Sequence, residues 1–351
     1  MQNYSCKNCG AELYWDTAAG CLKCQYCDAE YQAEEFEDRT TADESTIKNE
    51  ELDKDYVNVE TTDDMVVYEC KTCGGEVVAM SNTMATICPY CGEAISITQK
   101  SVGTFRPELC IPFKKDKKEI MEIYKNYVSK SFLTPKEFKE QNTIEKIQGL
   151  FTPFYLHNLT NDASHTFSGE KVTSRKRGYD KVDTHNVYSL SIDAKGVFEK
   201  LPTDASVRIE NSLMDAIEPF DYAECKDYNP AYMAGFLAEQ TDEDMEDMNK
   251  RADTRSIQAM REKARSAFTG YSSVTQQNED IRISNHSAQY VLLPVWLLNV
   301  KHGDKKYTFA INGQTGKVVG KLPMNKLKLF LLGGGAFLLT DLVFILGSLF
   351  G

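Results

Sequence analysis

Two stretches with the same spacing decide the N-terminal fold: CKNCGAELYWDTAAGCLKCQYC at residues 6–27 and CKTCGGEVVAMSNTMATICPYC at residues 70–91. In each stretch a Cys-x2-Cys pair is followed by fourteen residues and then a second Cys-x2-Cys pair. A Cys-x2-Cys turn presents two thiolates on one side, and two such turns complete a tetrahedral sulfur cage for Zn2+. The spacing therefore predicts two zinc ribbons. Their metal ligands are Cys6, Cys9, Cys24, Cys27, Cys70, Cys73, Cys88 and Cys91.

The residues beside the cysteines support this interpretation. Glycine, which adopts a positive φ at little cost, follows three of the four pairs. These glycines are Gly10, Gly74 and Gly92. Asp28 follows the fourth pair and tolerates the same turn less well. Aligning the two stretches places Cys21 opposite Ala85, so we expect Cys21 to be a spare thiol.

Four thiolates per site leave no open coordination position, so both zinc ions are expected to be structural. Ribbons of this size have little core, and the metal then supplies most of their folding free energy. A disulfide framework is the alternative for the eight cysteines. Nothing at the N-terminus resembles a signal peptide, and in a reducing compartment such thiols favour metal binding.

The C-terminal segment, residues 329–351, is apolar apart from Thr340, Asp341 and Ser348. As a helix rising about 1.5 Å per residue, it is long enough for a bilayer core of about 30 Å. A buried helix of a globular domain is the alternative. Four lysines precede the segment and favour a cytoplasmic N-terminal side; they are Lys317, Lys321, Lys326 and Lys328. We therefore expect a single-pass tail anchor at residues 329–350 in the cell membrane, with the bulk of the chain cytoplasmic.

Two features of this segment bear on partners. Gly333, Gly334 and Gly335 form a small-residue patch that would let another helix approach closely. Asp341 falls near mid-membrane, where an ionised carboxylate costs about 2.5–3.5 kcal/mol. These residues predict association with a second transmembrane helix. A marginal anchor that tolerates one acid is the alternative.

Charge is unevenly distributed along the chain. Residues 1–65 hold 17 acidic and 5 basic residues, which accounts for the whole net charge of −12. Because a phosphate backbone requires clustered positive charge, we do not expect nucleic acid as a partner. One basic cluster is interpreted as a solvated loop, with contact to anionic headgroups as the alternative. It consists of Lys171, Arg175, Lys176, Arg177 and Lys181.

The region after the second ribbon predicts a mixed domain with an antiparallel sheet. Helices are expected at residues 117–131, 209–217 and 241–268, and strands at 109–113, 151–159, 166–179, 187–192 and 197–201. The segments around Pro153 and Pro294 resemble each other, and proline places both at sheet edges or bulges.

The expected fold class is multidomain: two small β zinc ribbons, an α+β domain with an antiparallel sheet, and a C-terminal transmembrane helix. The expected boundaries are 1–37 for the first ribbon, 38–65 for an acidic linker, 66–100 for the second ribbon, 101–325 for the α+β domain and 329–350 for the anchor.

No catalytic motif is recognisable in the sequence. It has no nucleophile elbow, no phosphate-binding loop and no dinucleotide motif. Five histidines are scattered without metal-binding spacing, at His157, His165, His185, His286 and His302. Cys110 and Cys225 are interpreted as buried thiols rather than nucleophiles. We therefore do not expect an enzyme.

Further motifs carry a resemblance to a known group of proteins. They are CKTCGGE at 70–76, CPYCG at 88–92, TPFYL at 152–156, LMDAIEPFDY at 213–222, PAYMAGFLAE at 230–239, LPVW at 293–296 and NGQTGKV at 312–318. On these residues the chain resembles bacterial membrane-anchored proteins with TFIIB-type zinc ribbons. It is also similar to the zinc-ribbon membrane protein of the Bacillus operon that includes a phage-shock protein A homologue. The resemblance implies an adaptor in membrane-stress complexes, without defined catalysis.

Two functions fit these observations. The first is a membrane-anchored zinc-ribbon adaptor or scaffold that recruits protein partners at the cytoplasmic membrane face during envelope stress. Phage-shock-type or membrane-scaffold proteins are the partners that the resemblance implies. The second is a membrane-tethered nucleic-acid-binding zinc-ribbon protein. The acidic N-terminal region and the lack of a catalytic motif favour the first.

Overall fold

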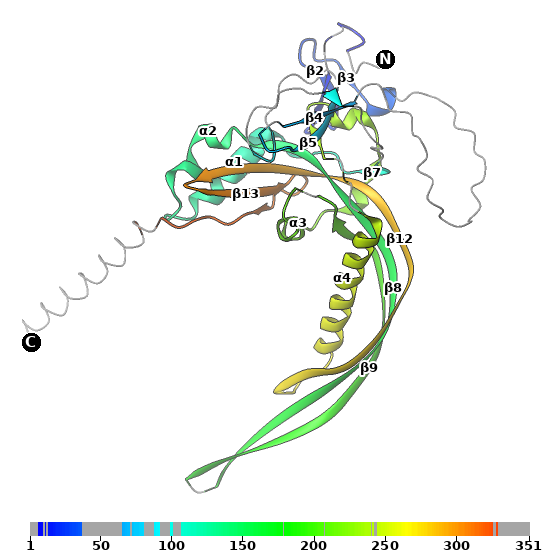
Figure 1. The fold of residues 1–351 in the computed structure, drawn as a ribbon, viewed down its shortest axis with the longest axis vertical. Coiled ribbons are helices and arrows are strands. Elements are labelled where there is room, and N and C mark those ends of the chain that lie inside the picture. The colour runs from blue at the N-terminus through cyan, green and yellow to red at the C-terminus, as the bar shows by residue number, and fades with distance from the viewer. Residues whose placement is uncertain are drawn as a thin grey trace, which may run out of the picture. The chain divides into compact units, whose positions relative to one another are not determined.

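The chain forms two compact units, seen in a computed structural model (Figure 1). The structure describes residues 6–9, 11, 13–36, 65–70, 72–80, 88–91, 99–100, 107–177, 179–206, 208–239, 241, 244–325 and 328. The first unit comprises Met1–Thr152, Arg208–Gln240 and Leu292–Gly351. The second comprises Pro153–Val207 and Thr241–Val291.

The first unit begins with a small antiparallel sheet of three strands in the order β1, β2, β3. These strands are Leu13–Asp16, Cys21–Cys24 and Glu30–Tyr31, and the 3-10 helix η1 (Ala33–Phe36) follows them. Alternation along β1 buries Leu13 and Trp15. The β1–β2 turn closes where Gly20, at φ 66°, donates its N–H to the Asp16 carbonyl. The hairpin thereby brings Cys24 opposite Leu13.

A larger sheet follows in the first unit, and its strands β8 and β12 continue along the chain into the second unit. Its order is β10-β7-β12-β8-β11-β5-β4-β6, and β13 pairs with both β12 and β14. The strands are β4 (Met65–Glu69), β5 (Glu76–Met80), β6 (Gln99–Lys100), β7 (Leu109–Cys110), β8 (Gln148–Arg177), β10 (Lys226–Asp227), β11 (Leu237–Ala238), β12 (Ser273–His302), β13 (Lys305–Asn312) and β14 (Val318–Val319). Phe113 packs at the centre, stacked on Phe236 with 4.1 Å between ring centroids.

The two proline-bearing segments lie inside this sheet order, so their predicted edge position is wrong. Pro153 belongs to β8, between β12 and β11, and Pro294 belongs to β12, between β7 and β8. Proline lacks an N–H but keeps an acceptor. The carbonyls of both prolines accept hydrogen bonds, from the Ala205 and Gly313 N–H groups respectively.

Short helices cover the first unit. They are α1 (Lys117–Ser129), η2 (Lys136–Lys139), α2 (Gln141–Ile144), α3 (Asn211–Ile217), η3 (Tyr222–Glu224) and η4 (Pro230–Met233). The longest of these, α1, confirms the helix expected at residues 117–131. A capping box between Asp116 and Glu119 starts it, and its buried face carries Ile120, Tyr124 and Val128.

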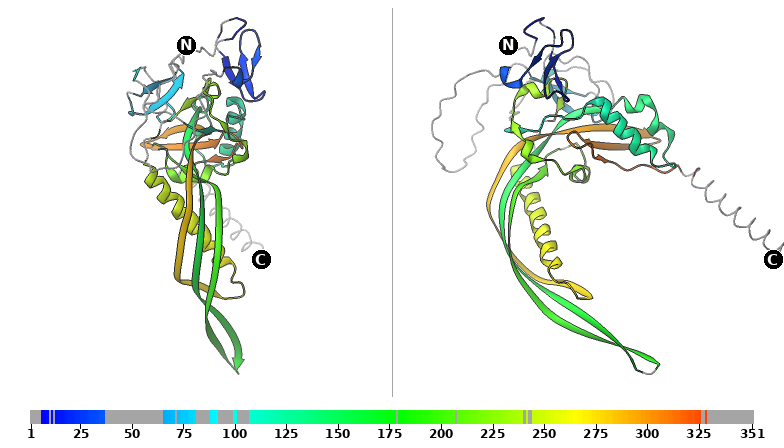
Figure 2. Two further views of the ribbon diagram at one scale, coloured as in Figure 1. Left: turned by 90° about the vertical axis from the view of Figure 1, so that its right-hand side faces the viewer. Right: turned by 180° about the vertical axis from the view of Figure 1, so that it is seen from behind.

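The second unit is a long β-ribbon with one helix. Strand β9 (Asp180–Asp204) pairs antiparallel with β8 from Phe154 opposite Asp204 to Arg177 opposite Asp180. The ribbon is curved, and helix α4 (Met245–Ser266) runs along its concave side (Figures 1 and 2). Acidic residues begin α4 and basic residues end it, as the helix dipole favours. Several strands expected separately are thus two continuous ones.

A bulge interrupts the β8–β9 pairing near one end. His157 faces Leu201 and Leu159 faces Phe198, so two β9 residues lie opposite Asn158. One of them, Lys200, has φ 53°, and its N–H donates to Asn158 Oδ1 at 2.9 Å. The side chain of Asn158 therefore replaces the missing ladder bond.

The predicted fold class is wrong in its proportions and in its membrane helix. The described chain is mostly β-sheet with few helices. Among the described residues no helix is long and apolar enough to cross a membrane. The longest, α4, has 22 residues but carries charge along its length. For the part of the chain that the structure describes, this finding counts against the transmembrane helix of the predicted fold class and against the predicted cell-membrane location.

Some predicted segments cannot be compared with the structure. The anchor at residues 329–350, including Gly333, Gly334, Gly335 and Asp341, lies outside the described residues. The acidic linker at residues 38–65 also lies outside them, apart from its last residue.

Candidate metal centres

The first four cysteines converge from two turns. The Sγ atoms of Cys6 and Cys27 are 3.4 Å apart, and those of Cys9 and Cys24 are 3.5 Å apart. All four sulfur atoms lie within 4.8 Å of one another. Each turn closes through a backbone bond, from Cys6 N–H to the Ala11 carbonyl and from Cys24 N–H to the Ala29 carbonyl. The cysteines therefore form one zinc-ribbon-like site.

The second four cysteines repeat this arrangement. The Sγ atoms of Cys70 and Cys91 are 3.6 Å apart, and those of Cys73 and Cys88 are 3.7 Å apart. These four sulfur atoms also lie within 4.8 Å of one another. The Cys70 N–H donates to the Gly75 carbonyl, as Cys6 does in the first site. The chain thus carries a second zinc-ribbon-like site.

The turn residues adopt the conformation that the sequence predicts. Gly74 has φ 66° and Asp28 has φ 55°, both in the left-handed region. Each donates its N–H to the carbonyl of the first cysteine of its pair, Cys70 or Cys24. Gly10 and Gly92 lie outside the described residues.

Hydrogen bonds around the sulfur atoms favour thiolates at part of each site. The Tyr31 hydroxyl, 3.3 Å from Cys6 Sγ, lowers the pKa of Cys6 to about 6. The backbone N–H of Tyr26 lowers the pKa of Cys24. At Cys70, burial raises the pKa, but N–H groups in its own turn outweigh burial and the pKa falls to about 7. Thiolates are the form of cysteine that binds metal.

Cys21 lies on β2, outside the group of four, as the alignment of the two repeats predicts. It is buried, and burial raises its pKa. We expect Cys21→Ser to leave the metal content unchanged at two equivalents per chain, because the variant removes no ligand. Elemental analysis of the purified protein measures this. Loss of one equivalent would contradict the assignment of Cys21 as a spare thiol.

The first site is attached to the larger sheet's connecting segments through backbone and aromatic contacts. The Trp15 N–H donates to the Ala234 carbonyl at 3.2 Å, and the Trp15 ring meets Tyr232 edge-on at 4.8 Å. Asn229 Nδ2 donates to the Ala33 carbonyl at 3.3 Å. These contacts hold the hairpin of the first site against η4.

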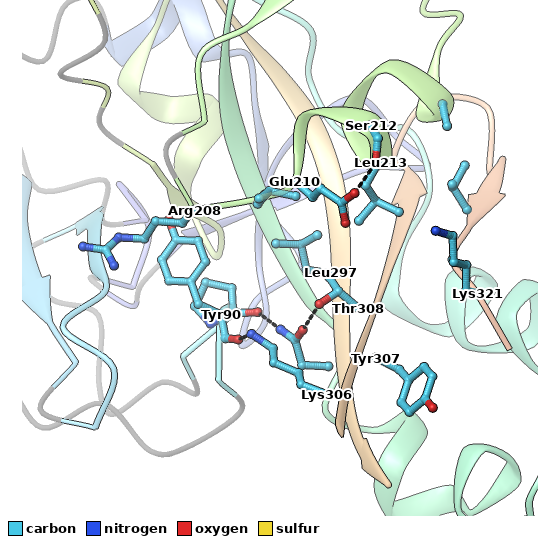
Figure 3. Close-up of a pocket in the computed structure, with 16 residues that line it drawn as sticks. Tyr90, Arg208, Glu210, Ser212, Leu213, Leu297, Lys306, Tyr307, Thr308 and Lys321 are labelled. Carbon is cyan, nitrogen blue, oxygen red and sulfur yellow. Dashed lines mark hydrogen bonds between the residues drawn. The ribbon is translucent and has the colours of Figure 1, made fainter. Parts of the chain in front are cut away.

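The second site is attached through its own turn carbonyls (Figure 3). Asn299 Nδ2 donates to the Pro89 carbonyl, and Lys306 Nζ donates to the Tyr90 carbonyl. Arg208 donates to the Gly74 carbonyl at 2.6 Å. The ring of Tyr90, between Cys88 and Cys91, is buried. The metal-binding turns and strands β12 and β13 are therefore joined by side-chain bonds.

Two other cysteines were predicted to be buried thiols. Cys110 is buried, and burial raises its pKa to about 12. Cys225 is only half-buried, because it follows η3 at the surface of the unit. Neither belongs to the metal-binding groups found among the described residues.

The structure brings together two histidines that the sequence separates by 129 residues. His157 Nδ1 lies 3.0 Å from His286 Nε2, and His157 Nε2 lies 2.7 Å from Thr203 Oγ1. His286 Nδ1 lies 3.6 Å from Asp253 Oδ1. These four groups, the histidine chain, join β9, β8, β12 and α4 within the second unit. No local motif predicts it, because each element contributes one group.

Burial and nearby positive charge both lower the pKa of His157, the centre of the histidine chain. Burial lowers the pKa of His157 to about 4, and nearby His286, Arg251 and Arg255 act in the same direction. Arg251 lies 3.2 Å from Asp204, and Arg255 donates to the Pro202 carbonyl. His157 is therefore neutral at pH 7.

Comparison with known proteins finds a relative that matches nearly the whole chain. No protein-family model matches the chain, and no solved structure matches it. The uncharacterized protein YdjG of Bacillus subtilis (strain 168) is 31% identical over 348 residues, covering 97% of each chain. The chain belongs to the YdjG family. The match spans the sequence of both units.

Membership of the YdjG family supports only part of the resemblance to membrane-anchored zinc-ribbon proteins. The structure confirms the two groups of four cysteines with zinc-ribbon spacing. YdjG itself is described only as uncharacterized. Nothing in the comparisons connects this family to a phage-shock operon.

Proposed function

We propose that this YdjG-family protein is a non-catalytic adaptor that binds protein partners and contains two structural zinc ions. The two closed groups of four cysteines carry the proposal. A tetrahedral site with Zn–S bonds of about 2.3 Å has sulfur–sulfur edges of about 3.8 Å. The closest sulfur pairs, at 3.4–3.7 Å, fit this size. Cys6, Cys9, Cys24 and Cys27 would hold one ion, and Cys70, Cys73, Cys88 and Cys91 the other.

The end of the β8–β9 hairpin supports partner binding. This hairpin end is defined as residues 171–177 and 179–188. Large apolar side chains are exposed there, and exposed apolar groups mark interaction surfaces when they gather. They are Val172, Tyr179, Val182, Val187 and Tyr188. In the described part of the chain, Arg175, Lys176 and Arg177 make no ion pair, so positive charge borders these apolar groups.

A photo-crosslinking experiment tests the adaptor function. A benzoylphenylalanine replaces Tyr179, which is fully exposed on the hairpin end. The matched control places it at Arg282, a charged and exposed residue of β12 in the same unit. We expect one discrete set of protein crosslinks from position 179 in cells, identified by mass spectrometry, and none of that set from position 282. Identical crosslinks from both positions would contradict the proposal.

Nucleic-acid binding is the second candidate, favoured by the five basic residues of the hairpin end. It predicts recovery of nucleic acid, rather than protein, on the crosslinked chain. It also predicts affinity for duplex DNA that falls steeply with salt, as counterion release requires. Protein crosslinks that survive nuclease treatment would exclude this function.

A further inference from the structure

The second metal centre borders a cavity of about 570 Å3 in the first unit. Its walls come from the Pro89–Tyr90 turn, from the segment containing Arg208 and α3, and from strands β12 and β13 (Figure 3). We call it the knuckle pocket, because the turn between Cys88 and Cys91 forms one wall. Small-molecule sites have volumes of about 300–1,000 Å3, so the cavity is large enough for a small ligand.

The lining of the knuckle pocket divides into an apolar and a cationic part. Leu213, Leu297 and Val319 supply apolar surface. Arg208, Lys306 and Lys321 supply positive charge. Glu210 is the one carboxylate among the lining residues, and it accepts a hydrogen bond from Ser212 Oγ at 2.6 Å. The lining therefore carries a net charge of +2, from three cations and one anion.

The cations keep donor capacity for a ligand. Lys306 donates one hydrogen bond, to the Tyr90 carbonyl, and an ammonium group has three N–H donors. Lys321 is exposed and makes no hydrogen bond or ion pair with any described residue. Carboxylates form charge-assisted hydrogen bonds with such groups.

We propose that the knuckle pocket binds a small monocarboxylate with an aliphatic body, and that the second metal centre holds the wall that completes it. Apolar surface from β12, β14 and α3 takes the aliphatic body, while Lys321 binds the carboxylate; Lys306 lies on the other side of the pocket, on the Tyr90 carbonyl (Figure 3). The Pro89 and Tyr90 carbonyls are fixed on Asn299 and Lys306, so displacement of the turn opens the pocket. The wall of the pocket depends on the structural zinc of the proposed function. It does not depend on the partner-binding hairpin end.

Calorimetric titration of the full chain with decanoate tests the pocket. We expect saturable binding of decanoate at one site, and none of decanol, which lacks the charge. Lys321→Ala is expected to weaken binding about fivefold, the effect of one exposed ionic contact. Lys305→Ala removes an exposed lysine of β13 outside the pocket and is expected to leave decanoate binding unchanged. Ala216→Phe, from a half-buried lining position, is expected to fill the cavity and weaken binding more than tenfold.

A pair of cysteine variants tests the wall. Cys73→Ser disrupts the second centre and is expected to abolish decanoate binding, while Cys9→Ser disrupts the first and leaves it intact. Zinc content and circular dichroism of both variants are measured alongside. Absence of decanoate binding, or equal affinity in Lys321→Ala, Ala216→Phe and the unmodified chain, would overturn the pocket. Decanoate affinity in Cys73→Ser equal to that of the unmodified chain would contradict the role of the second metal centre in forming the wall. Crosslinking from Tyr179 reports on the adaptor function separately.

Discussion

Replacing Cys73 with serine is expected to release one of two zinc equivalents and to unfold the second metal centre while the first stays intact. Apparent zinc-binding free energies at such sites are about 10–16 kcal/mol. That range matches or exceeds the whole stability of a typical domain, about 5–15 kcal/mol. The turns of this centre bury few large side chains of their own, chiefly that of Tyr90. Without the metal, the hydrogen bonds that Asn299, Lys306 and Arg208 donate to the turn carbonyls are the main described contacts left to hold them.

Hydrogen–deuterium exchange of the full chain, with elemental analysis, measures this effect. We expect lost protection in β4 and β5, which pair from Met65 opposite Met80 to Glu69 opposite Glu76. Protection in β1 and β2 should be unchanged. The Cys9→Ser variant is the mirror control, with the losses exchanged between the two ribbons. A Cys73→Ser chain that keeps two zinc equivalents, or full protection in β5, would show that this cysteine is no ligand.

Acidification from pH 7 to pH 5 is expected to destabilise the second unit through His157. The pKa of His157 is lowered to about 4 in the folded chain, against an ordinary value of 6.5. As the pH falls below 6.5, the imidazole of His157 takes up a proton in the unfolded chain but stays neutral in the folded chain. Stability is therefore full above pH 6.5 and declines as the pH falls towards 4. The total loss is about 3 kcal/mol.

Exchange of amides in β8 and α4, followed at pH 7, 6 and 5 and corrected for intrinsic rates, measures this decline. His157→Gln removes the titrating group and should flatten the pH dependence, whatever it does to stability at pH 7. His302→Gln is the matched control, because His302 is partly exposed beside Glu137 in the first unit. Restricting the measurement to the second unit separates the effect from acid release of zinc. An unchanged slope in His157→Gln would refute the prediction.

The metal-binding groups could be predicted from sequence because their information is local and repeated. Four cysteines within 22 residues define each group, and the second copy identifies Cys21 as the extra thiol. Helices α1 and α4 were predictable for a similar reason, since their apolar spacing and end charges lie within one segment. Such features require no knowledge of which strands are neighbours.

Features that depend on strand pairing were missed. His157 and His286 meet only because β8 and β12 are adjacent. The length of β8 and β9 was also missed, since alternating exposed residues outside the core make a strand look like several shorter ones. The knuckle pocket combines residues from four separate segments. The membrane helix was inferred from apolar length, a property that many kinds of segment share, and no described residue forms such a helix.

The bulge at Lys200 has a consequence for self-association. Among the described strands β9 pairs only with β8, so one edge of this 25-residue strand has no strand partner. An open, flat edge of this length is a template for amyloid-like stacking. The positive φ of Lys200 bends that edge, and Lys181 and Lys195 add charge along it. We expect these features to oppose edge-to-edge stacking of the hairpin.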